Sequence, residues 1–213
     1  MSKDRVRADW PALQDIVAGT TLRHSDYELP RNPQWLNQVH GSRVVHWGSA
    51  DFDDGPPDAD AIVSDQPDSI CVVQTADCVP ILLCARDGSE IAAIHGGWRG
   101  LAANIIDATL NAMNTPEQDL VAWIGPAISQ SAFEVGQEVR EAFGKWGERD
   151  TMFRHNERGR LQADLFGLAQ GMLRARGVEP FGEVRCTFAD ADRYYSYRRD
   201  GSTGRMLSFV YRN

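Results

Sequence analysis

The chain has 213 residues, of which 42% are hydrophobic and 24% are charged, and its formal net charge is -8. This composition is typical of a folded globular protein and argues against extensive disorder. The acidic balance excludes nucleic acid and anionic membranes as first choices of partner, because both attract positively charged surfaces.

The length suits one domain that spans residues 1–213, which is the working prediction. The opening residues, MSKDRVRADW, lack the apolar core of a signal peptide, and the longest apolar stretch is interrupted by Asp77 and Pro80. The chain has four cysteines: Cys71, Cys78, Cys84 and Cys186. Their spacing fits neither a CxxC motif nor a disulfide scaffold, so reduced thiols and a cytoplasmic protein are expected.

In chain order, Val39 to Trp47 is predicted as a strand interrupted at Gly41, and an acidic loop follows over residues 51–60. Four short runs rich in valine and isoleucine then predict adjacent buried strands: AIVS, SICVVQT, VPILLCA and EIAAIH. The motif HGGWRG, residues 95–100, lies where the last of these strands passes into a helix. Apolar residues at helical spacing predict a single helix over Leu101–Met113.

The second half begins with a predicted strand, LVAWIG, and a short helix between Phe133 and Phe143. Asp164 is the expected N-cap of a helix over Leu165–Arg176, which Gly177 ends. The stretch YYSYRRDGSTGR is expected to form a hairpin with most of its tyrosines toward the core, before a last strand, MLSFVY. Grouped strands with a few helices favour an α+β fold, either a mixed sheet or a sandwich of sheets with outer helices.

Three candidate metal ligands lie at strand ends or turns: His40 in QVHG, Cys78 in TADCVP and His95 in HGGWRG. Antiparallel strands that leave and re-enter one end of a sheet would bring Cys78 and His95 together. One thiolate and two imidazoles suit Zn²⁺ and leave a fourth position open, which is typical of a catalytic site. Without metal, Cys78 and His95 would form the thiolate–imidazolium pair of a cysteine hydrolase, and the residues alone leave both interpretations open.

Four further residues are expected to contact substrate or an anion: Arg99, Arg198, Asp77 and Gln38. Arg99 follows two glycines at a helix N-terminus, where a guanidinium and free backbone N–H groups favour an anion, although an exposed arginine at a turn explains it equally well. Asp77 is also a candidate acid, as is Asp200, and both fit a structural role as caps of backbone N–H groups.

Several motifs, in this order, resemble the YfiH-like laccase-domain family from about Trp35 onward: QVHG, DADAIVSD, TADCVPILL, AAIHGGWRGLA, WIGPAI, FEVGQEV, DL at 164–165 and YYSYRRDGSTGR. Members of the family have been described as multicopper polyphenol oxidases, as a peptidoglycan editing factor and as purine nucleoside phosphorylases. The resemblance implies one Zn²⁺ held by His40, Cys78 and His95, which are also the catalytic residues. It implies an α+β fold of α/β/β/α layers, two mixed sheets flanked by helices, similar to toxin-type cysteine deamidases.

The activities that the resemblance implies are phosphorolysis of adenosine, inosine and methylthioadenosine to base and sugar 1-phosphate, and deamination of adenosine. The expected partners are these small molecules, with a monomer favoured. The segment before QVHG, AGTTLRHSDYELPRNPQW, is shorter than is usual in the family, so the substrate range is not predicted.

Three alternatives stay open. The first is a Cys–His amide hydrolase that edits peptidoglycan precursors, and the second is a non-catalytic module that binds nucleoside or metal. The third is a copper-dependent polyphenol oxidase, which is disfavoured because several copper ions need many histidines. The chain has five: His24, His40, His46, His95 and His155.

Overall fold

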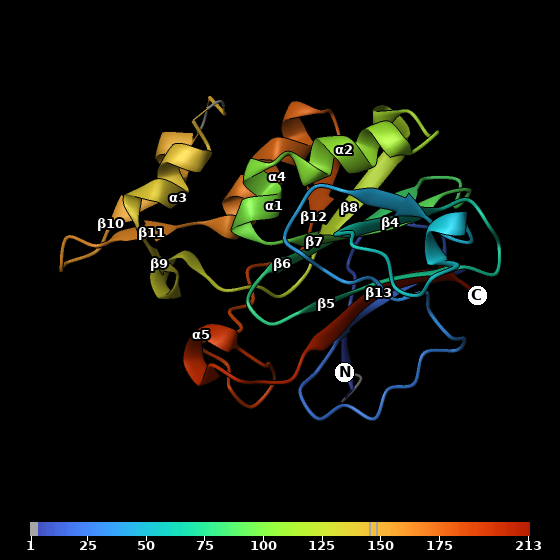
Figure 1. The fold of residues 1–213 in the computed structure, drawn as a ribbon, viewed down its shortest axis with the longest axis horizontal. Coiled ribbons are helices and arrows are strands. Elements are labelled where there is room, and N and C mark those ends of the chain that lie inside the picture. The colour runs from blue at the N-terminus through green and yellow to red at the C-terminus, as the bar shows by residue number, and fades with distance from the viewer. Residues whose placement is uncertain (1–3, 145, 148) are drawn as a thin grey trace.

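A computed structural model describes residues 4–144, 146–147 and 149–213 (Figure 1). The strands are β1 (Arg5–Arg7), β2 (Ile16–Thr21), β3 (Val44–His46), β4 (Ala61–Ser64), β5 (Ile70–Thr75), β6 (Val79–Ala85), β7 (Ile91–Gly96), β8 (Leu120–Ile124), β9 (Glu134–Val135), β10 (Phe153–His155), β11 (Leu161–Ala163), β12 (Glu179–Phe181) and β13 (Met206–Arg212). The α-helices are α1 (Trp98–Ala102), α2 (Ile105–Ala112), α3 (Gln137–Ala142), α4 (Leu165–Ala175) and α5 (Tyr197–Asp200). Four 3₁₀ turns are η1 (Ala50–Phe52), η2 (Glu117–Asp119), η3 (Gln130–Ala132) and η4 (Arg149–Met152).

Two stacked sheets form the centre of the described chain. The larger has six strands in the order β12-β8-β6-β7-β4-β3, and it is mixed, because the β12–β8 and β3–β4 pairs are parallel while the pairs between them are antiparallel. The second has four antiparallel strands in the order β1-β2-β13-β5. A small sheet of β10, β11 and β9 lies to one side, beside α3 (Figure 1).

Strand β6 shows why these segments are so apolar. Ile81 and Leu83 point into the cluster that α1, α2 and α4 cover, whereas Leu82 and Cys84 point into the cluster between the two sheets. A strand buried on both faces reads as a continuous apolar run, as VPILLCA does. Helices α1, α2 and α4 lie along one side of the six-stranded sheet (Figure 1), and the coil segment that carries Tyr27 and Leu29 covers the outer face of the other sheet.

These observations confirm the α+β class and the two stacked sheets. Of the two sheets that were expected to be mixed and flanked by helices, only the larger is mixed, and coil covers the outer face of the antiparallel one. The structure also confirms the helix that begins after Asp164, since the Asp164 side chain accepts a hydrogen bond from the Gly167 backbone N–H at 2.9 Å. Gly177, just past that helix, has the positive φ, 81°, of a glycine that ends a helix.

Three predicted elements differ from the structure. The helix expected over Leu101–Met113 is two helices, because Asn104 takes a left-handed φ of 64° and starts a new turn. The strand expected from Val39 begins only at Val44, since His40 has a φ of 60° that no strand accommodates. The expected hairpin is instead the short helix α5, which the side chain of Ser196 caps.

Two further details differ from the prediction, namely where one helix starts and which tyrosines are buried. The short helix between Phe133 and Phe143 starts at Gln137, after the two-residue strand β9. In YYSYRRDGSTGR, Tyr194 is buried in the core between the sheets as expected, but Tyr197 is 62% exposed. This exposed tyrosine lies at the edge of the site described next.

Candidate active site

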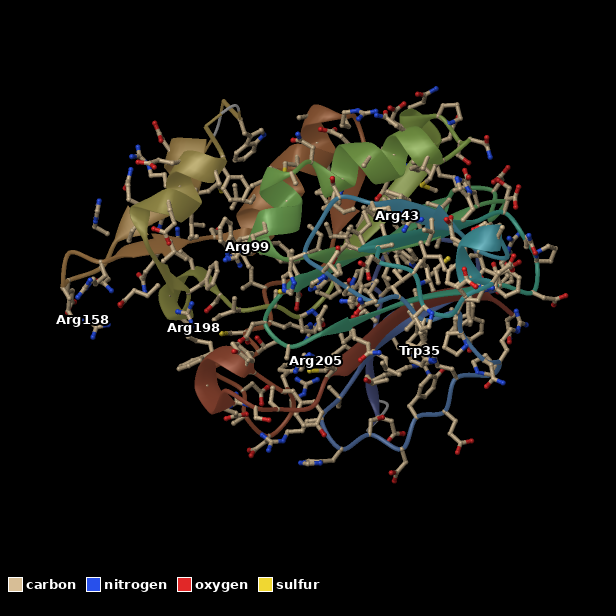
Figure 2. The ribbon with its side chains drawn as sticks, viewed as in Figure 1. Trp35, Arg43, Arg99, Arg158, Arg198 and Arg205 are labelled. Carbon is tan, nitrogen blue, oxygen red and sulfur yellow. The ribbon has the colours of Figure 1, made fainter. Side chains whose placement is uncertain are left out.

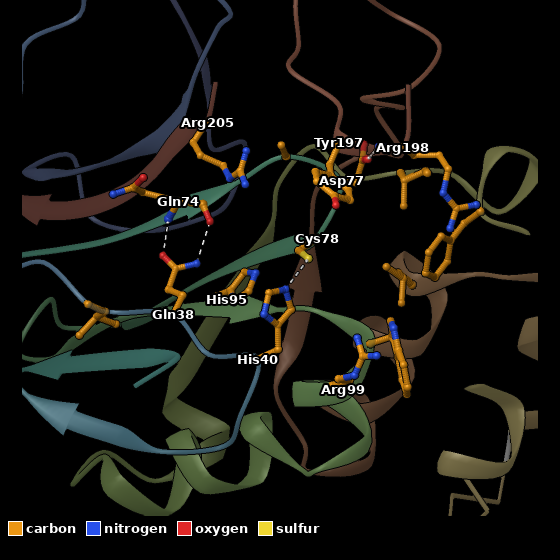
Figure 3. Close-up of a pocket in the computed structure, with 16 residues that line it drawn as sticks. Gln38, His40, Gln74, Asp77, Cys78, His95, Arg99, Tyr197, Arg198 and Arg205 are labelled. Atoms are coloured by element: carbon orange, nitrogen blue, oxygen red, sulfur yellow. Dashed lines mark hydrogen bonds between the residues drawn. The ribbon is translucent and has the colours of Figure 1, made fainter. Parts of the chain in front are cut away.

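Strands β6 and β7 bring Cys78 and His95 together. The two strands are antiparallel with Val79 opposite Gly96 and Pro80 opposite His95, so Cys78 and His95 lie at the same end of the pair. His40 reaches this point from a loop, and its Nε2 lies 3.9 Å from Cys78 Sγ (Figure 3). One ligand atom from each of the three residues lies within 4.8 Å of the others, so the three form a potential metal site.

Asp60 holds both histidines in place. Its fully buried carboxylate accepts the backbone N–H groups of His40 at 2.9 Å and Gly41 at 2.6 Å, and it accepts His95 Nδ1–H at 2.7 Å. The bond to Nδ1 leaves Nε2 of His95 free to serve as a ligand. Asp60 was not among the predicted site residues, although the quoted motif DADAIVSD contains it.

The glycines of HGGWRG allow close approach. A Cβ on Gly97 would lie 2.8 Å from His40 Cδ2 and 3.3 Å from Cys78 Sγ, and a Cβ on Gly100 would lie 2.9 Å from the Gly41 carbonyl oxygen. A side chain at Gly97 would therefore push His40 away from the cluster. This position needs glycine for space, since its φ of -68° is one that any residue adopts.

The pKa values of Cys78 and His95 are shifted by their neighbours. Burial opposes ionisation of Cys78, but hydrogen bonds and charge from His40 and His95 outweigh it and lower the pKa of Cys78 to about 6. Burial disfavours the charged form of His95, but its hydrogen bond to Asp60 and the neighbouring thiol raise the pKa of His95 to about 9. At neutral pH the metal-free cluster is thus a reactive pair of a thiolate and an imidazolium, and a metal ion would bind with loss of the His95 proton.

A cavity of about 510 Å³ opens above the cluster, which is a volume typical of small-molecule sites. Its walls combine aromatic, aliphatic and cationic groups (Figure 3). The lining residues are Leu36, Gln38, His40, Gln74, Ala76, Asp77, Cys78, His95, Trp98, Arg99, Ile128, Phe133, Leu165, Tyr197, Arg198 and Arg205. All seven predicted site residues are therefore among them.

Three arginines reach the cavity. The guanidinium of Arg99 lies over the Trp98 ring at 4.3 Å, and that of Arg198 lies over Phe133 at 5.1 Å. Both are on the same side of Cys78, whereas Arg205, which the sequence analysis did not select, is on the other side, near Gln74 (Figures 2 and 3). Stacking on an aromatic ring holds a guanidinium with its N–H groups directed outward, which suits anion binding.

Gln38 and Asp77 line the cavity with their polar atoms already paired. The Gln38 amide accepts the Gln74 N–H at 2.7 Å and donates to the Gln74 carbonyl at 2.8 Å, as an additional strand would. Asp77 accepts hydrogen bonds from the C-terminal part of the chain. The second candidate acid, Asp200, pairs with Arg199 at 2.9 Å at the end of α5 and does not line the cavity.

The fold and the site together define an α+β protein with a His–Cys–His cluster at the floor of a cationic cavity. Residues 14–213 match the family described as multi-copper polyphenol oxidoreductase laccase, and the chain belongs to that family. The resemblance drawn from the motifs is thereby confirmed.

Two relatives with similar sequences are named purine nucleoside phosphorylases. The chain is 42% identical to a purine nucleoside phosphorylase, YfiH, from Escherichia coli over 184 residues, which are 86% of this chain and 75% of that protein. It is 44% identical over 190 residues to a protein from Pseudomonas aeruginosa that is also named purine nucleoside phosphorylase, with the same coverage of 86% and 75%. These relatives support an enzyme of the nucleoside phosphorylase kind.

Solved structures agree on the fold. A Neisseria meningitidis protein, NMB0706, is 37% identical, with a TM-score of 0.90 over 99% of this chain and 100% of its own. YlmD from Geobacillus stearothermophilus is 25% identical, with a TM-score of 0.82 over 100% and 97% of the two chains. Among the described residues, no helix combines the length and the apolar character that crossing a bilayer requires.

Proposed function

We propose that this chain is a zinc-dependent purine nucleoside phosphorylase that converts adenosine, inosine and methylthioadenosine, with phosphate, to free base and sugar 1-phosphate. The observation that carries the proposal is the joint presence, in one cavity, of the His40–Cys78–His95 cluster and the stacked arginines Arg99 and Arg198. The names of the relatives support it. A monomer acting in the cytoplasm on diffusible substrates is part of the same proposal, in keeping with four free thiols.

The residues of the cluster fit a single zinc ion. Two imidazoles and a thiolate are ligands that Zn²⁺ prefers, and Asp60 orients His95 as carboxylates commonly orient zinc-bound histidines. When bound, the metal supplies a Lewis acid that does not change its oxidation state. The described residues contain one such three-ligand cluster, which suits one ion better than the several coppers of a laccase.

Arg99 and Arg198 are the proposed phosphate-binding groups. A guanidinium presents paired N–H donors that match two phosphate oxygens, and two arginines on one wall would direct phosphate to the side of the cavity next to the cluster. Tyr197, which is exposed at the edge of the cavity, offers a ring face for a planar base. Deamination of adenosine, the second proposed activity, needs the cluster but no bound phosphate.

One observation favours a second candidate function. The lowered pKa of Cys78 and its contact with His40 and His95 are what a cysteine nucleophile needs, so the same cluster without metal fits an amide hydrolase that acts on peptidoglycan precursors.

The deciding experiment measures turnover of adenosine and inosine with and without phosphate, after the metal content has been determined. We expect stoichiometric zinc, phosphate-dependent release of adenine and hypoxanthine, and loss of both metal and activity in Cys78→Ala. Turnover of a peptidoglycan precursor amide by metal-free protein, without nucleoside phosphorolysis, would support the hydrolase and contradict the phosphorylase.

The role of Arg99 is testable in the same assay. Arg99→Ala should raise the KM for phosphate about tenfold or more, because a hydrogen-bonded charge is lost, while adenosine deamination stays largely intact. Arg43→Ala is the matched control, since Arg43 is exposed, pairs with Asp51 and lies away from Arg99 (Figure 2). Equal losses of phosphorolysis and deamination in Arg99→Ala would contradict this assignment.

A further inference from the structure

Asp77 joins two distant parts of the chain next to the cluster. It lies in the short segment that passes from β5 in one sheet to β6 in the other, immediately before Cys78. One oxygen of its buried carboxylate accepts the Thr187 hydroxyl at 2.6 Å. The other accepts the Ser196 hydroxyl at 3.1 Å and the backbone N–H of Arg198 at 2.7 Å. The carboxylate of Asp77, the residue before Cys78, therefore hydrogen-bonds to the segment that leads into α5.

This segment carries Arg198 into the cavity. Ser196 caps α5 by accepting the backbone N–H of Arg199 at 3.2 Å, and Asp77 accepts the N–H of Arg198 in the same first turn. The Arg198 guanidinium then extends over Phe133 and donates to the Glu134 carbonyl oxygen at 2.9 Å. Figure 3 shows Asp77 between Cys78 and the start of α5. Asp77 thus connects the residue beside Cys78 directly to the backbone that carries Arg198.

We infer that Asp77 is a positioning residue that places Arg198 beside the His40–Cys78–His95 cluster and takes no part in proton transfer. The inference rests on the proposed function, in which Arg198 binds phosphate. Both carboxylate oxygens already accept hydrogen bonds from protein donors, namely the Thr187 and Ser196 hydroxyls and the Arg198 N–H. An acid that served the reaction would need an oxygen free to face the substrate.

Two substitutions separate positioning from acid–base chemistry. Asp77→Asn keeps an oxygen for the Arg198 N–H, and the Thr187 hydroxyl is able to rotate and accept from the new amide. Asp77→Gly removes every acceptor but accommodates the left-handed φ of 88°, whereas alanine would add backbone strain. If Asp77 only positions Arg198, Asp77→Asn should therefore retain activity. If Asp77 acts as an acid, Asp77→Asn should lose it.

We expect Asp77→Gly to raise the KM for phosphate about tenfold or more with zinc content unchanged, because the charge-assisted bonds that hold α5 are lost. Asp77→Asn should remain within about threefold of the unmodified protein and keep the same pH profile of kcat/KM. Loss of activity in Asp77→Asn as deep as in Asp77→Gly, or a shifted pH profile, would overturn the inference. Unchanged KM for phosphate in both variants would overturn it as well.

A measurement that does not depend on enzymatic turnover tests the inference independently of the proposed function. Limited digestion with trypsin, followed by mass spectrometry, reports how firmly α5 is held, since trypsin cleaves after Arg198 and Arg199. Cleavage there should accelerate in Asp77→Gly and stay at the original rate in Asp77→Asn. If the unmodified protein turns over no nucleoside, the proposed function fails, and equal cleavage rates in all three proteins would still decide against the inference.

Ser196→Ala alters the same hydrogen-bond network and leaves residue 77 unchanged, so it serves if Asp77→Gly does not fold. It removes the cap of α5 and one donor to Asp77. Faster cleavage in α5 and a raised KM for phosphate are expected, and an unaltered protein by both measures would contradict the inference.

Discussion

A single buried carboxylate organises the candidate site at the scale of residues. Asp60 accepts hydrogen bonds from the loop that carries His40 and from the His95 ring, so it places two of the three ligands at once. These hydrogen bonds, against the cost of burial, lower the pKa of Asp60 and keep it ionised. The third residue of the cluster, Cys78, lies just before β6, and the register of β6 with β7 brings it to the same end of the pair as His95.

Asp60→Asn should therefore weaken zinc binding by about 10- to 100-fold, because the amide does not hold the His95 ring and the His40 loop in the same way. Competition with a chromophoric chelator measures the affinity. Asp53→Asn, at an exposed residue just after η1, removes the same charge elsewhere and should leave the affinity unchanged. Equal affinity in all three proteins would show that Asp60 does not organise the ligands.

At the scale of elements, Arg176 connects three segments of the helical layer. It lies at the end of α4 and donates to Asp107 of α2 at 2.8 Å and to Glu117 of η2 at 2.6 Å, with a further bond to Asn111 at 2.9 Å. The hydrogen bond from Arg176 lowers the pKa of Glu117 below its ordinary value of 4.5. The pair thus stabilises the folded chain above that pH, and its contribution is lost as the pH falls through the lowered pKa.

Glu117→Gln should accordingly be less stable than the unmodified protein near neutral pH, and the difference should shrink as the pH falls from about 5 to about 3. Urea unfolding at a series of pH values measures both free energies of unfolding. Glu141→Gln, at an exposed position in α3, provides the control without this dependence. A stability difference that stays constant across the range would mean that the pair with Arg176 contributes nothing.

At the scale of the whole molecule, stability depends on the core between the two stacked sheets. Leu82 of β6 is fully buried and points into the apolar cluster that also contains Val73 of β5 and Val210 of β13. The His40–Cys78–His95 cluster lies at the end of these same strands, so the packing of the sheets also sets the positions of Cys78 and His95.

Leu82→Ala should cost about 2–5 kcal/mol of unfolding free energy, because a cavity would be left between the sheets. Leu13→Ala is the matched control, since Leu13 is 45% exposed and should cost less than about 0.5 kcal/mol. Denaturant unfolding with two spectroscopic probes measures both variants. A small loss in Leu82→Ala would mean that the two sheets do not share a tightly packed core.

Elements with strong local signals were predictable. The four apolar runs are strands, and Asp164 caps its helix as its position before an apolar periodic segment indicated. Elements whose conformation depends on partners far away in the sequence were not predictable. Asn104 divides a continuous helical pattern, and α5 replaces a hairpin because Asp77 and Ser196 supply acceptors for its first backbone N–H groups.

The sequence alone determined which apolar segments form strands, to which family the chain belongs and which three residues are potential ligands. These features depend on local periodicity and on motifs in a fixed order. Only the tertiary structure decided which polar groups reach the cavity and which of them are already paired. Asp60 and Arg205 reach the site from segments whose local pattern says nothing of it, whereas Asp77 and Gln38 turn their polar atoms to backbone and side-chain partners. Hydrogen-bond partners that lie tens of residues away leave no periodic trace in the chain, so they become visible only once the two sheets are packed together.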